Sequence, residues 1–188
     1  MPNRFSDAAT YPFTAQDILC IDTNVWLDLF PPTPAFRKSK WVELCTSTYK
    51  KIKQSKASII VDISVLSEYL NWYARFEWNV YKNNPGNIPF SSFKDFRNSA
   101  YFKPIAKTSF TLASRIIAQC RLNVQSIGGS FDIIHILDDY ESMKCDFNDS
   151  VLAENCRIFG YKLVTNDDDF GKTDYGIDII THNPKLLP

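Results

Sequence analysis

Four short apolar runs, separated by longer stretches with helical character, constrain the fold of this chain most strongly. The runs are ILCI (18–21), SIIV (58–61), KLVT (162–165) and IDII (177–180), and we interpret them as buried strands. Apolar residues recur at spacings of three and four over 65–76 and 151–159, and residues 36–54 and 105–121 also fit helices. This alternation predicts an α/β fold with a central, mostly parallel sheet and helices on both faces.

Bulk composition places the chain among globular proteins. Its 188 residues are enough for one domain with a sizeable core, and 45% hydrophobic content is too high for a disordered chain. No stretch approaches the ~20 apolar residues of a membrane-spanning helix. The N-terminal segment has no basic stretch followed by an apolar block, so we predict no secretory signal and no membrane partner.

Charge and cysteine content narrow the function further. Lysine plus arginine equals aspartate plus glutamate at 21 each, so any nucleic-acid binding must depend on a local basic patch. The five cysteines are odd in number and widely spaced, with no CxxC pair and only two histidines, which argues against a zinc site. The pattern is typical of a reduced, cytoplasmic protein.

The segment 79–104 interrupts the alternation of strands and helices. It contains Pro85, Gly86, Pro89 and Pro104 among many aromatic residues, and those aromatics favour burial. We therefore predict an elaboration on the domain here, and not a linker.

Four carboxylates are expected at one edge of the predicted sheet. Asp22 directly follows the first strand, Glu68 lies early in the helix after the second, and Asp167 follows the third. Asp149 lies in the first turn of the helix that precedes the third strand. Ligands bind beyond the carboxyl ends of the strands in open parallel sheets. Crowded carboxylates repel one another unless a hard cation such as Mg²⁺ or Mn²⁺ neutralises them, and Asn24 could hold one of them by a hydrogen bond.

Three sequence segments carry a resemblance to a known family. IDTNVW (21–26), VLSEYLN (65–71) and DFNDSVLAENCRIFGYKLVTNDDDF (146–170) resemble the PIN-domain ribonucleases, including the VapC-type toxins of bacterial toxin–antitoxin pairs. In that family an Asp-x-Asn follows the first strand and a Glu follows the second. An Asp then opens a helix, a Gly ends it, and Thr-x-Asp closes the next strand. The resemblance covers 18–80 and 130–182, whereas 81–129 matches no part of it.

The resemblance implies a fold, an activity and a set of site residues. The fold would be a three-layer PIN-like domain spanning 1–188, with a family-atypical insertion at about 79–129. The activity would be Mg²⁺- or Mn²⁺-dependent hydrolysis of RNA. The implied metal-binding and catalytic residues are Asp22, Glu68, Asp149 and Asp167, and the implied supporting residues are Asn24 and Thr165. By their positions in the sequence, Asp146, as a helix cap or an acid behind the ligands, and Asp169, as the next choice after Asp167, are further supporting candidates. RNA would be the substrate, a toxin would have an antitoxin partner, and a homodimer stays open.

Simpler interpretations exist for several of these residues. Asp22 could only cap the helix that follows it, and either Asp146 or Asp149 could be a helix cap. Glu68 lies off the apolar stripe of its helix, so periodicity alone favours a solvent-exposed position. The aromatics at 72–81 could stack on bases or simply pack, and the basic residues at 37–56 could steer a phosphate backbone or only form a soluble face.

Two other functions remain to be weighed beside the nuclease. The same scaffold could serve as a non-catalytic RNA- or protein-binding module, but the presence of all four acids argues against it. A phosphatase of the haloacid dehalogenase class also places an Asp after its first strand. That chemistry requires a second Asp two residues later, where this chain has Asn24.

Overall fold

The computed structural model describes most of the chain. It covers residues 2–31, 40–87, 89–120, 122–124 and 147–188, together with 132, 135–136, 139 and 144–145. The expected supporting residue Asp146 and the first residues of the helix expected at 36–54 lie outside the described residues.

The centre of the molecule is a six-stranded sheet in which every pairing is parallel. Its strands are β1 (Arg4–Asp7), β2 (Ile18–Ile21), β3 (Ser58–Asp62), β4 (Leu122–Val124), β5 (Lys162–Val164) and β6 (Asp178–Thr181). They lie in the order β1-β6-β5-β2-β3-β4. The four strands expected from the apolar runs are confirmed within one residue at each end, whereas the two edge strands β1 and β4 were not predicted.

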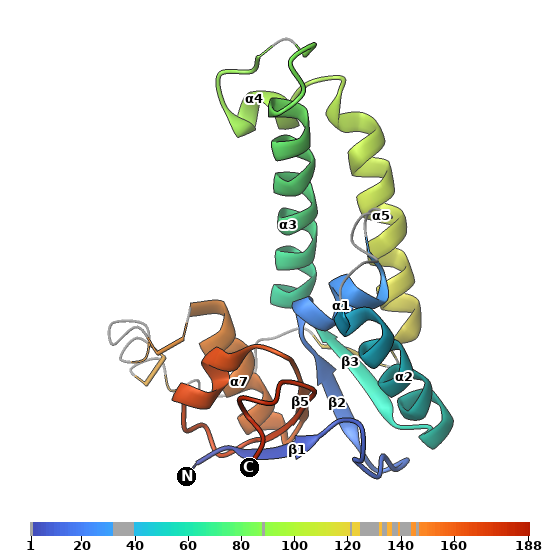
Figure 1. Cartoon of the computed structure of the whole chain (residues 1–188), viewed down its shortest axis with the longest axis vertical. Helices are drawn as coiled ribbons and strands as arrows, with labels where there is room; N and C mark the ends of the chain where they lie inside the picture. The colour runs from blue at the N-terminus through green and yellow to red at the C-terminus, as the bar shows by residue number, and fades with distance from the viewer. Residues whose placement is uncertain are drawn as a thin grey trace.

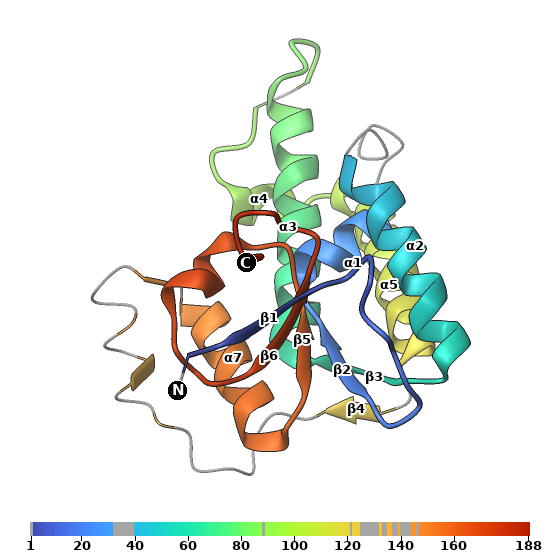
Figure 2. The same ribbon diagram turned by 60° about the horizontal axis from the view of Figure 1, so that its bottom comes forward.

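Helices cover both faces of this sheet. The helices are α1 (Thr23–Leu29), α2 (Lys40–Ser55), α3 (Ile63–Lys82), α4 (Phe93–Arg97), α5 (Phe102–Gln119) and α7 (Phe147–Phe159), with a 3₁₀ turn η2 (Asp168–Lys172). Ile21 and Val164 face α2, where they line a small cavity with Cys45. Cys20, the neighbour of Ile21, points the other way and contacts Cys156 of α7. Figure 2 shows α2 and α7 on opposite sides of the strands, as the expected three-layer arrangement requires.

Burial accounts for the core of this arrangement. Leu19, Cys20 and Ile21 are each at most 1% exposed, because β2 is central and covered on both faces. Trp26 of α1 is fully buried beside them. At the end of α7, Gly160 takes a left-handed conformation with φ of 66°, which is the helix stop that the sequence indicated.

Two long helices project away from the sheet. Figure 1 shows α3 and α5 side by side, rising from the body with α4 at their tip. We call residues 63–119 the helical arm; the structure describes all of them except residue 88. The tip has its own small core, because Trp78, Tyr81 and Phe90 all pack around the fully buried Phe96. Packing is therefore the main role of most aromatics in 79–104, although Tyr101 stays 53% exposed.

Two further expectations can be compared with the structure. All five cysteines are free thiols. Among the described helices, none combines the length and the apolar character that crossing a membrane would require.

Candidate active site at the carboxyl edge of the sheet

The path of the chain through the sheet creates a crevice at the ends of β2 and β5. From β2 the chain moves outward to β3 and β4, and it then returns to β5 on the other side of β2. Connections leave β2 and β5 in opposite directions at this point, which is where open parallel sheets bind ligands. Asp22 directly follows β2, and Thr165 directly follows β5. The fold therefore brings together the ends of two segments that are more than 140 residues apart.

Three donors hold the carboxylate of Asp22 in place. The backbone N–H of Thr23 donates to Oδ1 at 2.5 Å. The Thr165 hydroxyl donates to Oδ2 at 2.7 Å, and the Asn24 side-chain amide donates to the same oxygen at 2.5 Å. Asp22 does cap α1, as the simpler interpretation held, and it is also only 3% exposed. Asn24 and Thr165 contact it directly, so these two of the four residues expected to support the site lie where they can orient this acid.

The environment of Asp22 is unfavourable to a bare negative charge. Burial first of all, and then the nearby charges of Glu68 and Asp167, raise the pKa of its carboxyl group, which lies at about 7. The hydrogen bonds from Thr165 and Thr23 act in the opposite direction and favour the charged form. Near neutral pH this acid is thus poised between its two states, and a bound cation would favour ionisation.

Glu68 reaches the same edge from the second turn of α3. The Thr23 hydroxyl donates a hydrogen bond to its Oε2 at 2.9 Å. The side chain is half-buried, so the solvent-exposed position that periodicity favoured is wrong. Thr23 was missed by the sequence reasoning, since nothing local shows that its hydroxyl lies beside a residue 45 positions away.

Asp167 lies on the loop after β5. Its backbone N–H donates to the Thr165 hydroxyl at 3.1 Å, and its carboxylate accepts from the Asp169 N–H at 2.9 Å, which caps η2. The other two acids of the run have lysine partners. Asp168 pairs with Lys185 at 2.7 Å, and Asp169 pairs with Lys172 at 2.5 Å. Asp167 is therefore the acid of this run that acts on Asp22.

A buried acid at the end of β3, Asp62, holds α7 against the carboxyl edge of the sheet, and this role was not predicted from the sequence. Asp62 ends β3, is 1% exposed, and accepts a hydrogen bond from the Asn155 side chain of α7 at 2.9 Å. The signal was available, because Asp62 follows SIIV as Asp22 follows ILCI. Asp149 is half-buried in the first turn of α7, about 9 Å along the helix from Asn155.

The donor set suits a hard divalent cation, since carboxylate oxygens are what Mg²⁺ and Mn²⁺ prefer. The electrostatic crowding of Asp22 by Glu68 and Asp167 is the observation that fits a cation here. Within the described parts of the chain, however, no three Asp, Glu, His or Cys side chains stand close enough together to hold a metal ion. The fold thus places candidate ligands at one edge of the sheet, but in the described residues they are not close enough together to coordinate one cation.

Comparison with known proteins supports the fold. The chain is similar to a chain in the crystal structure of VapBC2 from Rickettsia felis bound to a DNA fragment from their promoter, with a TM-score of 0.51 and 12% sequence identity. The match covers 87% of this chain and 98% of that one. No protein-family model and no curated protein matches the sequence. The architecture is therefore the expected three-layer PIN-like fold, with a central parallel sheet and helices on both faces.

Proposed function

We propose that this protein is a metal-dependent endoribonuclease that hydrolyses RNA phosphodiester bonds at the carboxyl edge of its sheet. One observation carries the proposal. Asp22 is a buried, strand-terminal carboxylate at the crevice between β2 and β5, with Glu68 and Asp167 close enough to raise its pKa. A buried acid kept near its titration point in such a crevice is a candidate functional group. The PIN-like fold agrees with this assignment.

Asp22, Glu68, Asp167 and Asp149 would hold Mg²⁺ or Mn²⁺. A metal bound there would supply a water activated for attack and positive charge to stabilise the phosphorane-like transition state. The remaining residues orient the acids. Thr165 and Asn24 donate hydrogen bonds to Oδ2 of Asp22 and hold it in place. The Thr23 hydroxyl, just after β2, donates to Glu68 and so connects the end of β2 to the N-terminal part of α3. Supporting hydrogen bonds of this kind typically change metal affinity or activity by ~10–100-fold.

A second candidate is a PIN-like module that binds RNA or protein without cleaving it. The observation in its favour is that no three candidate ligands among the described residues stand at metal-binding distance from one another. Both candidates share the fold, and they differ in whether a divalent cation binds at Asp22.

The deciding experiment measures cation binding and RNA cleavage in the same preparations. The wild type, Asp22→Asn and Asp178→Asn would be incubated with a mixed RNA pool in Mn²⁺, in Mg²⁺ and in chelator. Asp178 lies on strand β6 at a salt bridge with Arg4, so its variant is a matched control. We expect metal-dependent fragments from the wild type and the control, and a loss of more than ~100-fold in Asp22→Asn, beyond the usual cost of a supporting residue.

Thermal unfolding supplies a readout that does not depend on activity. A cation that binds the native state raises the melting temperature, so Mn²⁺ should stabilise the wild type and Asp178→Asn more than Asp22→Asn. Equal shifts in all three proteins, together with no cleavage, would overturn the nuclease in favour of the binding module.

A toxin role is the narrower part of the proposal. It is supported by the likeness to a chain of VapBC2, which forms a complex. A toxin should arrest growth when expressed alone, and a co-expressed antitoxin, which would be its protein partner, should relieve the arrest. An inactive Asp22→Asn variant that arrests growth equally well would contradict toxicity through RNA cleavage.

A further inference from the structure

The neutral net charge of this chain hides two regions of opposite sign. The helical arm, residues 63–119, has seven lysines and arginines against Glu68, Glu77 and Asp95, a net charge of +4. Residues 120–188 have six against twelve, a net charge of −6. The local basic patch that a nucleic-acid binder of zero net charge requires is therefore present on the arm.

The positive charges of the arm are available to a ligand. All seven of its lysines and arginines are exposed, and within the described residues none of them forms a salt bridge. Two of the three acids of the arm are engaged elsewhere. Asp95 accepts hydrogen bonds from Ser91 and Ser92, and Glu68 accepts one from Thr23.

One face of α3 connects these charges to the candidate active site. Glu68, Asn71, Arg75, Asn79 and Lys82 follow one another at spacings of three and four, so they form a single stripe along the helix. The stripe begins at the site carboxylate Glu68 and ends ~21 Å away at Lys82, at 1.5 Å per residue. After Glu68 it holds only amides and cations.

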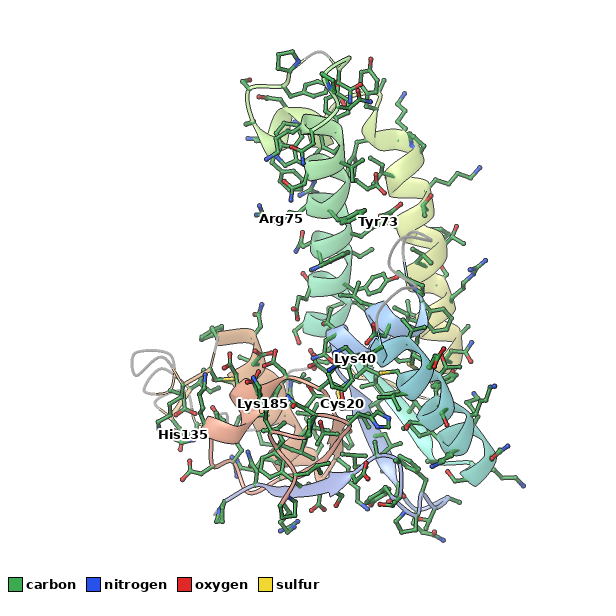
Figure 3. The ribbon with its side chains drawn as sticks, viewed as in Figure 1. Cys20, Lys40, Tyr73, Arg75, His135 and Lys185 are labelled. Atoms are coloured by element: carbon green, nitrogen blue, oxygen red, sulfur yellow. The ribbon has the colours of Figure 1, made fainter. Side chains whose placement is uncertain are left out.

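The four residues of this stripe that follow Glu68 are exposed. Tyr73 is buried and lies beside Thr108 of α5. Arg75 lies on the opposite side of the helix, as Figure 3 shows. Its guanidinium lies 4.9 Å from the ring centre of Phe93, and the Lys82 ammonium lies 5.1 Å from that of Trp78. These ring contacts hold both cations in place and leave their charge unneutralised.

A cavity beside the stripe adds an aromatic platform. It measures about 320 Å³, lies between α3 and α5, and is lined by residues that include Asn71, Ala74, Arg97 and Phe110. Phe110 is 74% exposed, which is unusual for a phenylalanine. Proteins that bind single strands combine a basic track for the backbone with exposed aromatic rings on which bases stack.

We propose that the stripe from Glu68 to Lys82, with the cavity at Phe110, is the docking track that leads single-stranded RNA into the active site. Arg75 and Lys82 bind the phosphates, Asn71 and Asn79 donate hydrogen bonds, and Phe110 stacks on a base. The track rests on the proposed function for the cleavage step, but binding itself requires no metal and no hydrolysis.

Binding of a labelled single-stranded RNA to the full chain in chelator tests the track without cleavage. The variants are Arg75→Gln/Lys82→Gln, Phe110→Ala and, as a matched control, Lys50→Gln/Lys53→Gln on α2, where both lysines are also exposed. We expect the arm double variant to bind at least tenfold more weakly at low salt. Its plot of log affinity against log salt should be shallower by about 1.4, or ~0.7 for each phosphate that the protein no longer neutralises.

Phe110→Ala gives a different signature because stacking releases no counterions. Its affinity should fall about fivefold or more, with the salt slope unchanged. Because Phe110 is exposed, the variant should fold normally. Cleavage in Mn²⁺ then separates the two proposals. The arm variants should raise KM with little change in kcat, whereas Asp22→Asn should bind the RNA and fail to cleave it.

Three results would overturn the track. The first is an arm double variant that binds RNA like the wild type. The second is an equal loss in the α2 control, which would show that the RNA is bound through overall charge or through the basic residues of 37–56, and not through a track on the arm. The third is an arm double variant that keeps its RNA affinity but binds a poly-glutamate peptide more weakly than the wild type does. That result would assign the stripe to an acidic protein partner. If the wild type binds RNA through the arm but never cleaves it, the proposed nuclease activity is wrong, whereas the proposed RNA-binding track stands.

Discussion

The helical arm and the C-terminal region of this protein use charge in opposite ways. In residues 120–188, all five described lysines and arginines form salt bridges: Lys144, Arg157, Lys162, Lys172 and Lys185. On the arm, the described part of the chain shows no salt bridge for any of the seven. Charges that are paired within the fold contribute to its geometry, whereas exposed and unpaired charges are available to bind something else.

Asp22 belongs to neither pattern, and it lies where the two regions meet. It is nearly as buried as Glu154, which pairs with Arg157. Among the described residues, however, the neighbours of Asp22 are hydrogen-bond donors and other carboxylates, and none is a cation. A buried acid of this kind costs the native protein stability whenever it is charged. The difference between a paired and an unpaired buried acid can be measured.

The largest expected effect is the pH dependence of Asp22. Because its pKa in the folded protein is about 7, against about 3.9 in an unfolded chain, the native state binds the proton more tightly. Stability is therefore highest below the unfolded pKa and is lost as pH rises through 7. In chelator, the free energy of unfolding of the wild type should fall by about 3 kcal/mol between pH 5 and pH 8 on account of this group.

Urea unfolding at several pH values checks this prediction. Asp22→Asn should show a much flatter profile over the same range and should be more stable than the wild type at pH 8. Asp178→Asn should follow the wild-type profile. If Asp22→Asn and the wild type lose stability in parallel, the burial of an unpaired charge at Asp22 is not what governs the profile.

A smaller effect is expected from separating a paired acid from its partner. Glu154 is fully buried, and Arg157 donates to both of its oxygens at 2.6 Å. Arg157→Ala should destabilise the protein by about 2 kcal/mol at pH 7, less than a fully buried pair would lose, because the Arg157 side chain is 45% exposed. Arg115→Ala on the arm, where no salt bridge is removed, should stay within about 0.5 kcal/mol.

The pH dependence of this loss has the opposite sign to that of Asp22. The hydrogen bonds from Arg157 hold the pKa of Glu154 below its usual range. The stabilisation is therefore present above the unfolded pKa and is lost as pH falls through the folded one. Chemical denaturation at pH 7 and at pH 3.5 should show that the free energies of unfolding of the wild type and Arg157→Ala differ less in acid. A difference that is larger at pH 3.5 would contradict the assignment of the Glu154–Arg157 pair.

The sequence predicted the layers of the fold because burial leaves a strong pattern. Apolar runs mark the four inner strands, which are covered on both faces. The edge strand β1 reads RFSD and is only half-buried, and β4 has three residues, so neither carries such a run. The helical arm was predicted as helices and an elaboration, but its projection from the body depends on tertiary packing of α3 against α5.

The sequence predicted those parts of the candidate site that lie directly after the apolar runs of the strands. Asp22, Asn24 and Thr165 lie next to strands, and the structure joins them by hydrogen bonds. The contact between Thr23 and Glu68 spans 45 residues and has no local signal. The metal-binding roles of Asp22, Glu68, Asp149 and Asp167 stay predictions, and so does the supporting role of Asp146, which lies outside the described residues.

The smallest expected change in stability would convert part of the arm to the paired pattern of the C-terminal region. Asn79→Glu places a carboxylate between Arg75 and Lys82 on the exposed face of α3, four residues from one and three from the other. Each new pair should stabilise the helix by about 0.2–0.5 kcal/mol. The same substitution should weaken RNA binding, because it neutralises the proposed track. Urea unfolding and RNA binding of Asn79→Glu, beside the uncharged control Asn79→Gln, measure both effects. If Asn79→Glu gains stability and keeps its full RNA affinity, the unpaired charges of the arm serve something other than RNA.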